Sequence, residues 1–490
     1  KYLKHKTKMN TSRRRAKSED THSMKTKYRF PPPNISDNRY DHDKKHIKKN
    51  RKLSLLHLIC SVGFFITIGF AFFCLYDVSS TKMLEARIES TSDVIERSLI
   101  DGFRSCHVSS DPVVSLNRRR GTSRCDRDEN VAIIVFETSY GCSDYVTYSV
   151  SFSIKNISCD VITKSRLHTC MFNISNIRSV DFEIMAEIET ETVFKHKDTI
   201  RLPSTEILKR TNFRSDSFKI GIVGDSQAET TLFRQQLEAM RMHDLNLFVH
   251  LGDVVQDDSS MFEWYLNFFR PVSSKIGTTP MLYSRGNHDV DGVVKRRRYF
   301  PDHPVSTISP NGYFALTASG IRFVVLDTAS PYDSRQKDWL ECEVSSSDWI
   351  NAKYRVVLTH IPPFIEYWNP KTWKKGENRW GYFNREVFVP ILERAGMDIM
   401  FSGHSHVYQR GRRGSSAYVV AGGGGATLEK PGENSARVED WNMYDKTYFG
   451  HHYTILSVVQ EISGESRLVV QTYSIENVLV DLFVVDESES

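Results

Sequence analysis

The sequence predicts an α/β domain that follows a small antiparallel β-sandwich and a single transmembrane helix. Three observations support this order. From about Phe218 onward, short apolar strand patterns alternate with helical patterns, which is typical of α/β folds. Between 131 and 194, short segments alternate apolar and polar residues with period two, which is typical of half-buried strands. An uncharged apolar run, 53–76, precedes both regions.

The charge of the chain is divided unevenly between an N-terminal tail and the remainder. Among the 490 residues, 1–52 carry 18 Lys or Arg against 5 Asp or Glu, whereas the rest carries 47 against 55. We therefore expect 1–52 to be a basic, disordered tail in the cytosol that acts as a solvated determinant of topology. Attraction to anionic lipid or to a sorting partner is the alternative. Nucleic-acid binding is not expected, because a membrane would separate this tail from the folded part of the chain.

The apolar run from Leu53 to Tyr76 has the length of a membrane span. Its 24 residues contain no Asp, Glu, Lys or Arg, and at about 1.5 Å per residue they cover the hydrocarbon core of a bilayer. Arg51 and Lys52 precede the run and Asp77 follows it. The positive-inside rule then predicts a single-pass type II protein, whose residues after Asp77 are luminal or extracellular. A cleaved signal peptide is the alternative, although the run is long for one.

The cysteines after the span agree with an oxidising compartment. They form a group of five without a Cys-x-x-Cys pair, and one more lies far downstream, which favours disulfides over a zinc site. The connectivity remains open. The residues are Cys106, Cys125, Cys142, Cys159, Cys170 and Cys342. Two glycosylation sequons, at Asn156 and Asn173, lie in the same region.

The remaining boundaries follow from changes in pattern. We expect 77–127 to be a luminal stalk, 128–206 a β-sandwich and 213–490 the α/β domain. Within the last domain, the patterns predict helices at 230–243 and 261–269. Strands are predicted at 219–223, 247–251, 281–283, 323–326, 355–358, 399–401 and 418–421. Ligands of α/β folds bind at the carboxyl ends of such strands.

Five short motifs follow these strands in order. They are Gly224-Asp225, Gly252-Asp253, Gly286-Asn-His-Asp289, Val357-Leu-Thr-His360 and Gly403-His-Ser-His406. Their order and residue types resemble the calcineurin-like metallophosphoesterase superfamily. The resemblance implies a four-layer sandwich of two mixed sheets flanked by helices, and a site that holds two metal ions.

The resemblance also implies a role for each motif residue. Asp253 would be shared between the metals, Asp225 and His406 would bind the first metal, and Asn287, His360 and His404 would bind the second. These nitrogen and oxygen ligands suit Zn, Fe or Mn, as two divalent or mixed-valence ions. His288 would be the general acid, oriented by Asp289.

Residues outside the metal set narrow the resemblance to the purple acid phosphatases. Gly403 to Arg410 matches the family's Gly-His-x-His-x-Tyr-x-Arg ending, and similarity extends over about 210–480. Segments 336–340 and 356–363 match the approach to the third motif, and Gly422 to Ala426 stands where the family has a glycine-rich turn. A phosphate-cradling loop is the alternative for these glycines. The plant-type members also have a fibronectin-like domain ahead of the catalytic one.

Two positions depart from the family pattern. Purple acid phosphatases have a metal-binding Tyr three residues after the bridging Asp, where this chain has Gln256. Other metallophosphoesterases have a His two residues after the first Asp, where this chain has Gln227. Both positions are therefore doubtful members of the metal shell, and we expect the first site to be weak.

The loop from Phe364 to Trp380 is the candidate for substrate contacts. It combines aromatic rings with Lys and Arg, which could stack on a nucleotide and attract its phosphate. The residues chosen are Tyr367, Lys371 and Arg379. The alternative is a loop packed on its own aromatic residues, with its lysines in solvent.

Together these features predict a membrane-anchored phosphoesterase that hydrolyses phosphomonoesters of small molecules or nucleotides. Two alternatives remain, a phosphodiesterase and a catalytically weak binding or adhesion protein with an incomplete first metal site.

Overall fold

The computed structural model describes residues 112–119, 129–137, 146–154, 158–160, 167–174, 177–188, 191–203, 218–258, 260, 263–289, 312–329, 334–432, 435–461 and 465–485. They belong to one compact unit, 97–490. No helix within these stretches combines the length and the hydropathy that a membrane crossing requires. The predicted tail, the predicted span 53–76 and most of the predicted stalk lie outside the described residues.

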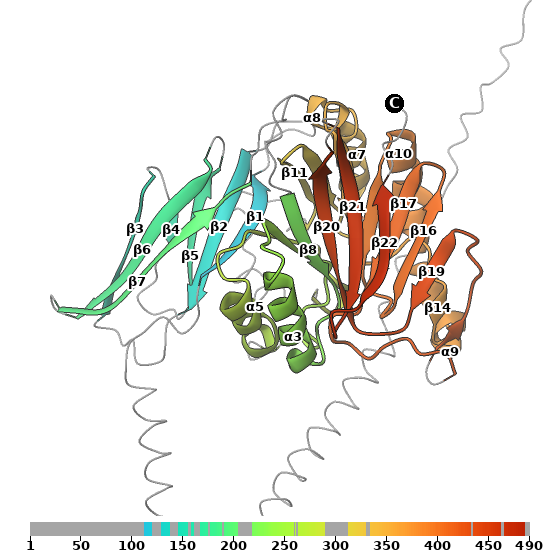
Figure 1. The fold of residues 1–490 in the computed structure, drawn as a ribbon, viewed down its shortest axis with the longest axis horizontal. Helices are drawn as coiled ribbons and strands as arrows, with labels where there is room; N and C mark the ends of the chain where they lie inside the picture. Colours follow the sequence, from blue (N-terminus) through green and yellow to red (C-terminus); the bar gives the residue numbers. More distant parts are fainter. Residues whose placement is uncertain are drawn as a thin grey trace, which may run out of the picture. The chain divides into compact units, whose positions relative to one another are not determined.

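The first sheet has ten strands in the order β22-β21-β20-β8-β9-β10-β1-β2-β5-β4 (Figure 1). Strands β8, β9 and β10 are parallel neighbours, whereas β20 is antiparallel to β8, so the sheet is mixed. Its strands are β1 Val113–Arg119, β2 Glu129–Glu137, β4 Ser158–Asp160, β5 Leu167–Asn173, β8 Phe218–Val223, β9 Leu247–His250, β10 Met281–Tyr283, β20 His452–Gln460, β21 Ser466–Ser474 and β22 Leu479–Val485.

The second sheet has seven strands in the order β11-β12-β13-β15-β17-β16-β19. The run from β12 to β17 is parallel, and the strands at either side of it are antiparallel. Its strands are β11 Phe314–Ala318, β12 Ile321–Val325, β13 Tyr354–Leu358, β15 Ile399–Ser402, β16 Tyr408–Arg413, β17 Ser416–Ala421 and β19 Tyr444–Tyr448.

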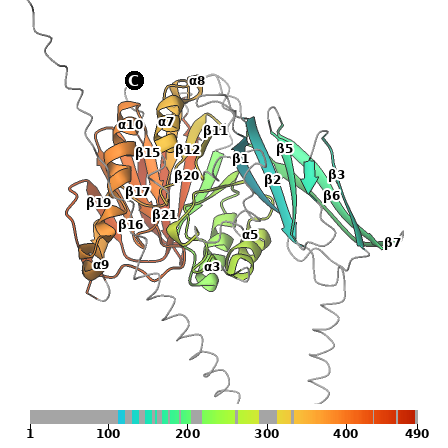
Figure 2. The ribbon, with the colours of Figure 1, turned by 180° about the vertical axis from the view of Figure 1, so that it is seen from behind.

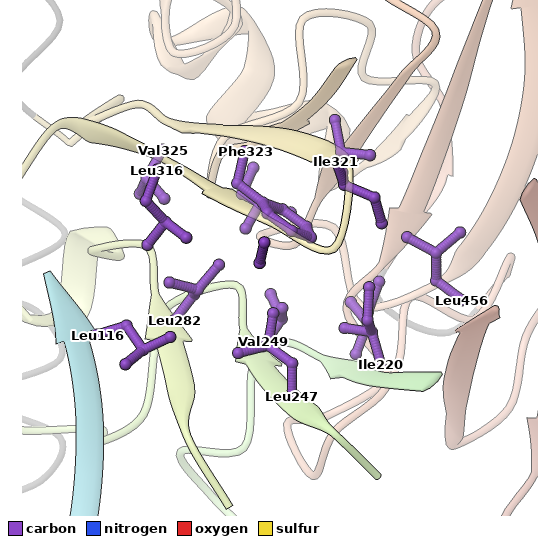
Figure 3. Close-up of a cluster of buried hydrophobic side chains, with 14 of the residues drawn as sticks. Leu116, Ile220, Leu247, Val249, Leu282, Leu316, Ile321, Phe323, Val325 and Leu456 are labelled. Atoms are coloured by element: carbon purple, nitrogen blue, oxygen red, sulfur yellow. The ribbon is translucent and has the colours of Figure 1, made fainter. Parts of the chain in front are cut away.

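The two sheets pack face to face through a continuous apolar core. Ile220, Val249 and Leu282 of the first sheet meet Phe323 and Leu316 of the second, and all five side chains are buried (Figure 3). Most residues on the opposite faces of these strands are apolar too, because helices cover them. Burial of this surface is the main stabilising contribution to such a sandwich.

Helices cover both outer faces. On the first sheet, Phe233, Leu237 and Met240 of α3 are spaced along one helical face and are buried against strands β8, β9 and β20. On the second, the helices α7 and α10 lie against β12, β13, β15 and β17 (Figure 2). The predicted α/β sandwich with two mixed sheets is confirmed. The helices are α3 Thr230–Arg241, η1 Trp264–Phe269, α5 Arg270–Lys275, α7 Ser334–Glu343, α8 Ser347–Ile350, η4 Asn384–Phe388 and α10 Val389–Arg394.

The N-terminal strands form a second, smaller sandwich. A three-stranded sheet of β3 Val146–Phe152, β6 Ser179–Ile188 and β7 Glu191–Arg201 faces β2 and β5. The ring of Phe152 lies 6.2 Å from that of Phe172 and 6.3 Å from that of Phe182. Phe172 belongs to β5 and Phe152 to β3, so the first contact joins the two layers, whereas Phe152 and Phe182 are cross-strand neighbours within the three-stranded sheet.

One boundary differs from the prediction. Val113–Arg119, which falls in the predicted stalk, is strand β1, and it pairs with β2 and, through Ser115, with Met281 of β10. The sandwich therefore begins earlier, and one of its layers continues the first sheet of the α/β domain. The sequence of β1 has only a weak period-two pattern. Few of its residues are apolar, and its C-terminal end is basic; Val114 and Leu116 are buried.

Candidate metal centre

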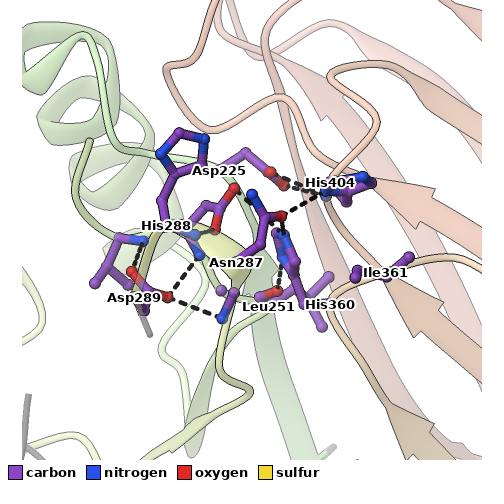
Figure 4. A network of polar contacts seen from close by, with 12 residues as sticks. Asp225, Leu251, Asn287, His288, Asp289, His360, Ile361 and His404 are labelled. Carbon is purple, nitrogen blue, oxygen red and sulfur yellow. Dashed lines mark hydrogen bonds and ion pairs between the residues drawn. The ribbon is translucent and has the colours of Figure 1, made fainter. Parts of the chain in front are cut away.

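The motif side chains lie at one edge of the two sheets. Asp225 follows β8, Asp253 follows β9, and Asn287 follows β10 in the short helix η2 Asn287–Asp289. His360 follows β13 and His404 follows β15. Because parallel strands end at the same edge, residues far apart in the sequence meet there (Figure 4).

Unusual backbone conformations aim three of these side chains inward. Asp225, Asp253 and His404 have positive φ angles of 61°, 53° and 66°, which are uncommon outside glycine and often mark functional sites. Gly252, at φ +98°, leaves room for the crowded turn, since a Cβ there would lie 2.7 Å from Nδ1 of His360.

The glycines that follow β17 allow close packing at the edge of the sheets where the motif side chains lie. A Cβ on Gly422 would lie 2.2 Å from the carbonyl oxygen of Ser405, and one on Gly424 would lie 2.3 Å from that of Gly224. Gly424 N also donates a hydrogen bond to the Gly224 carbonyl at 2.8 Å. These glycines therefore form a turn packed against the loop that carries Asp225, as the family resemblance implies.

Four ligand atoms converge at the predicted second metal site. Buried Asp253, His360 and His404 offer oxygen and nitrogen atoms within 4.8 Å of one another. Asn287 Oδ1 lies 3.0 Å from Nε2 of His360 and 2.8 Å from Nδ1 of His404. His360 also donates from Nδ1 to the carbonyl of Leu251 at 2.8 Å, which turns its Nε2 toward this group (Figure 4).

The predicted first-site residues Asp225 and His406 lie beside each other. His406 Nε2 is 3.5 Å from Oδ1 of Asp225, and its Nδ1 donates to the carbonyl of Thr427 at 2.6 Å. Both carboxylate oxygens of Asp225 accept from the main-chain nitrogen of His404 at 2.9 Å. Within the described residues, the cluster of converging ligand atoms does not extend to Asp225 and His406.

The electrostatics of the second site couple Asp253 to His360. Burial alone would lower the pKa of His360, but the nearby Asp253 carboxylate, 3.3 Å away, raises it to about 9. Conversely, burial alone would raise the pKa of Asp253, but the charges of His360 and His288 hold it below its ordinary value. A cation at this position would replace the proton of His360 as the partner of Asp253.

His288 and Asp289 have different neighbours from those predicted. The ring nitrogen Nδ1 of His288 lies 3.1 Å from the carbonyl oxygen of Gln256 and 3.2 Å from its side-chain Nε2. The carboxylate of Asp289 instead accepts from the main-chain nitrogens of Asp253, Val254 and Gly286. The prediction that Asp289 orients His288 is therefore wrong, because successive residues of a 3₁₀ turn point about 120° apart.

The two glutamines at the departing positions differ in their surroundings. Gln256 is half-buried and contacts His288, so its side chain supports the predicted general acid. Gln227 is 3% exposed, and no described group hydrogen-bonds its Oε1. A buried amide oxygen without a donor indicates an unseen water or ion.

The predicted substrate loop is folded on its own aromatic residues and on His404. Trp368 and Trp380 each contact the His404 ring, a relationship that the sequence did not reveal. The half-buried ring of Tyr367 packs edge-on against Phe449 at 5.0 Å. Lys371 and Arg379 are exposed. For Trp368 and Trp380, the structure therefore agrees with the alternative of a loop packed on its own aromatic residues.

Two buried pairs near the motifs were also missed from the sequence. His250 Nε2 lies 3.0 Å from Oγ of Ser226, which joins the loops of Asp225 and Asp253. Arg285 donates to Asp327 through both Nε and an Nη atom, which connects the Asn287 loop to the second sheet. Adjacency to a motif is the signal that could have found Ser226 and Arg285.

Comparisons with known proteins agree with this geometry. Residues 218–408 match the family model described as calcineurin-like phosphoesterase. Purple acid phosphatase 21 of Arabidopsis thaliana is 25% identical over 231 residues, which cover 42% of this chain and 51% of the relative. The Fe(3+)-Zn(2+) purple acid phosphatase 12 of the same plant is 27% identical over 168 residues, 31% of this chain and 34% of the relative.

Among solved structures, purple acid phosphatase PPD1 from yellow lupin (Lupinus luteus) seeds shares the fold. Its TM-score is 0.58 at 14% identity, and the match covers 78% of this chain and 75% of that one. The chain spans about half the length of the first curated relative. Residues 218–408 thus match the calcineurin-like phosphoesterase family, and the chain is similar to the purple acid phosphatases.

Proposed function

We propose that this protein is a metal-dependent phosphoesterase that hydrolyses phosphomonoesters of small molecules or nucleotides. The convergence of Asp253, Asn287, His360 and His404 is the observation that carries the proposal. A phosphodiester is the second candidate substrate, because the same site chemistry can serve either ester. The similarity to purple acid phosphatases supports the reaction class.

The residues present fit two transition-metal ions. The second-site set combines two imidazoles, an amide oxygen and a carboxylate, a mixture that suits Zn, Fe or Mn. Asp225 and His406 would hold the first ion together with Asp253, and the buried Oε1 of Gln227 is a further neutral donor in the same loop. Such ions, when bound, would activate a water and neutralise phosphate oxygens.

His288 is the proposed donor of the proton to the leaving oxygen. Its main-chain nitrogen donates to Oδ1 of Asp253 at 2.8 Å, so its position is tied to the metal set. Nδ1 can donate to the main-chain carbonyl of Gln256 or accept from its side-chain amide, and in either state Nε2 is the nitrogen left for proton transfer. Gln256 therefore takes over the orienting role that the sequence assigned to Asp289.

The rival proposal is a catalytically weak binding or adhesion protein that fills only the second site. The observation in its favour is that, among the residues that the structure describes, three or more converging His or carboxylate ligands are found there and not around Asp225. Metal content separates the two proposals, because the enzyme requires two ions per chain and the rival one. The measurement is elemental analysis of purified protein after dialysis against each metal.

Activity is the decisive test. The ectodomain, 77–490, should hydrolyse p-nitrophenyl phosphate with Zn, Mn or Fe, and Asp253→Asn or His360→Ala should abolish the reaction. His243→Ala is a matched control, since His243 lies beyond α3 and contacts Tyr453 away from the motifs. Equal background rates for wild type, the two site variants and the control would refute the enzyme.

The proposed setting is a type II membrane protein whose catalytic domain is luminal or extracellular. The excess of Lys and Arg before 53–76, and its absence after this run, supports this orientation. The group of cysteines after the span and the sequon residue Asn173, which is exposed on β5, both suit an oxidising compartment. In microsomes, residues 77–490 should resist added protease until detergent is present. Protection of 1–52 instead would reverse the orientation.

A further inference from the structure

We infer that Trp368 and Trp380 are positioning residues that hold the His404 imidazole in the orientation needed to bind the second metal ion. These two residues of the loop 364–380 then belong to the metal centre, and Trp368 does not serve as a stacking surface for substrate. This inference rests on the proposed function, because it concerns the ligand geometry of the same site.

The rings surround His404. The Trp368 ring is stacked on the imidazole, with centroids 4.7 Å apart and an interplanar angle of 19°. The Trp380 ring also lies 4.7 Å from the imidazole, tilted by 53°. The third neighbour is the imidazole of His360, at 5.1 Å and 77°. His404 is 2% exposed, so protein groups, these rings among them, and not water surround it.

Hydrogen bonds fix the tryptophans themselves. Trp368 ends the short strand β14 Tyr367–Trp368, which pairs with β18 Ala436–Arg437. Its Nε1 donates to Oε2 of Glu377 at 2.6 Å. Glu377 begins the short helix η3 Glu377–Arg379, and Trp380 caps the end of that helix. The buried carboxylate of Glu377 therefore connects the strand β14, which contains Trp368, to the helix η3, which Trp380 caps.

The consequence for His404 is a restricted side-chain rotation. Its Nδ1 lies 2.8 Å from Oδ1 of Asn287, and rotation of the ring would carry this nitrogen away from the metal ligands. A flat indole on one face and a tilted indole beside it oppose such rotation by steric contact. A ligand that is held in place before binding loses less conformational entropy when the ion arrives.

Burial also prevents Trp368 from stacking on a substrate. Trp368 is 4% exposed and packs with Ile361 and Ile365, so its faces are already covered. A stacked base would have to displace either these residues or His404.

The test uses the full chain, freed of metal with a chelator and then titrated with Mn²⁺. All seven tryptophans of the protein can report through fluorescence, and an open-shell ion quenches the nearest rings. The variants are Trp368→Leu, Trp380→Leu and the conservative Trp368→Phe, which keeps a stacked ring. Trp373→Leu is the matched control, because Trp373 lies in the same loop and packs against Ile361, Ile365 and Trp368.

The expected result is a loss of affinity for the tighter-bound ion of about 10- to 100-fold in Trp368→Leu and Trp380→Leu, the usual range for partners behind a metal ligand. Trp368→Phe should recover most of that affinity while losing part of the quenching. Trp373→Leu should bind Mn²⁺ as wild type does. Urea unfolding of each metal-free variant separates a general loss of folding from a loss of ligand positioning.

Wild-type affinity in Trp368→Leu and Trp380→Leu would overturn the inference and leave the proposed function intact. Equal weakening in Trp373→Leu would overturn it too, because the loop would then act through stability alone. If Trp368→Leu fails to fold, Trp380→Leu and Trp368→Phe still decide between these outcomes. A wild-type protein that binds no Mn²⁺, Zn²⁺ or Fe²⁺ would refute the proposed function itself, and with it this inference.

Discussion

The carboxylate of Asp289 accepts a hydrogen bond from the main-chain nitrogen of Asp253 at 2.8 Å, across 36 residues of sequence. Oδ2 accepts also from Gly286 at 2.9 Å and from the hydroxyl of Tyr283 at 2.7 Å, while Oδ1 accepts from Val254 at 3.1 Å. Burial and the charge of Asp253 raise the pKa of Asp289, and the donors oppose that rise. The residue therefore holds the Asp253 loop against the Asn287 loop.

Asp289→Asn should destabilise the protein and weaken its second metal site. The amide presents a donor to groups that are themselves donors, so we expect a loss of about 2 to 4 kcal/mol in the free energy of unfolding. Tyr283→Phe is the graded control, since it removes a single bond and should cost about 1 kcal/mol. Urea titration measures both. An Asp289→Asn protein as stable as Tyr283→Phe would contradict this role.

Arg285 and Asp327 form a buried ion pair between the two sheets, with side chains 6% and 3% exposed. Neutralisation of one partner breaks a buried ion pair, so Asp327→Asn should cost about 3 to 5 kcal/mol. The double variant Arg285→Met with Asp327→Leu should recover much of that loss, because neither charge then remains buried. Thermal unfolding of the wild type, Asp327→Asn and the double variant gives the loss of stability that each change causes. A double variant that loses more stability than Asp327→Asn would show that the two residues do not act as a pair.

The buried His250 predicts a stability that falls in acid. Burial lowers the pKa of His250 from 6.5 to about 3. Below about pH 6.5, His250 therefore binds a proton in the unfolded chain but stays neutral in the folded chain. Stability from this group is complete above pH 6.5 and is lost as the pH falls toward 3. Between pH 7 and 5 the loss is about 2 kcal/mol.

His250→Gln should remove this part of the pH dependence, since Gln does not titrate. The measurement is urea unfolding of metal-free protein at pH 7 and at pH 5 for both chains. An identical pH dependence in wild type and variant would assign the acid sensitivity to other groups.

The first metal site should be colourless and weaker than the second. No tyrosine follows Asp253 by three residues, so the phenolate that would favour ferric iron and give a visible band is absent at that position. Chelation followed by elemental analysis should show one ion leaving first. Gln227→Ala should speed its loss and Gln227→His should slow it, whereas Gln256→Tyr should bind the first ion more tightly. An intense visible band in metal-loaded wild type would contradict this.

Much of the α/β domain could be predicted because its apolar patterns are local. The strands before Asp225, Asp253 and His360 are short and mostly apolar, and a glycine or a polar residue follows within two positions, which identifies them without any partner. Strand β1 was missed because a short strand with a basic end has too little pattern of its own. Its identity as a strand depends on β2 and β10, which supply its hydrogen bonds.

The sequence by itself predicted which side chains would gather at the candidate metal centre, since each motif follows a predicted strand. Only the tertiary structure decided what surrounds those side chains. Asp289 faces away from His288, Gln256 supports it instead, and Trp368 covers His404 from a distant loop. These contacts depend on backbone angles and on side-chain packing between segments far apart in the chain, and a linear pattern records neither of them.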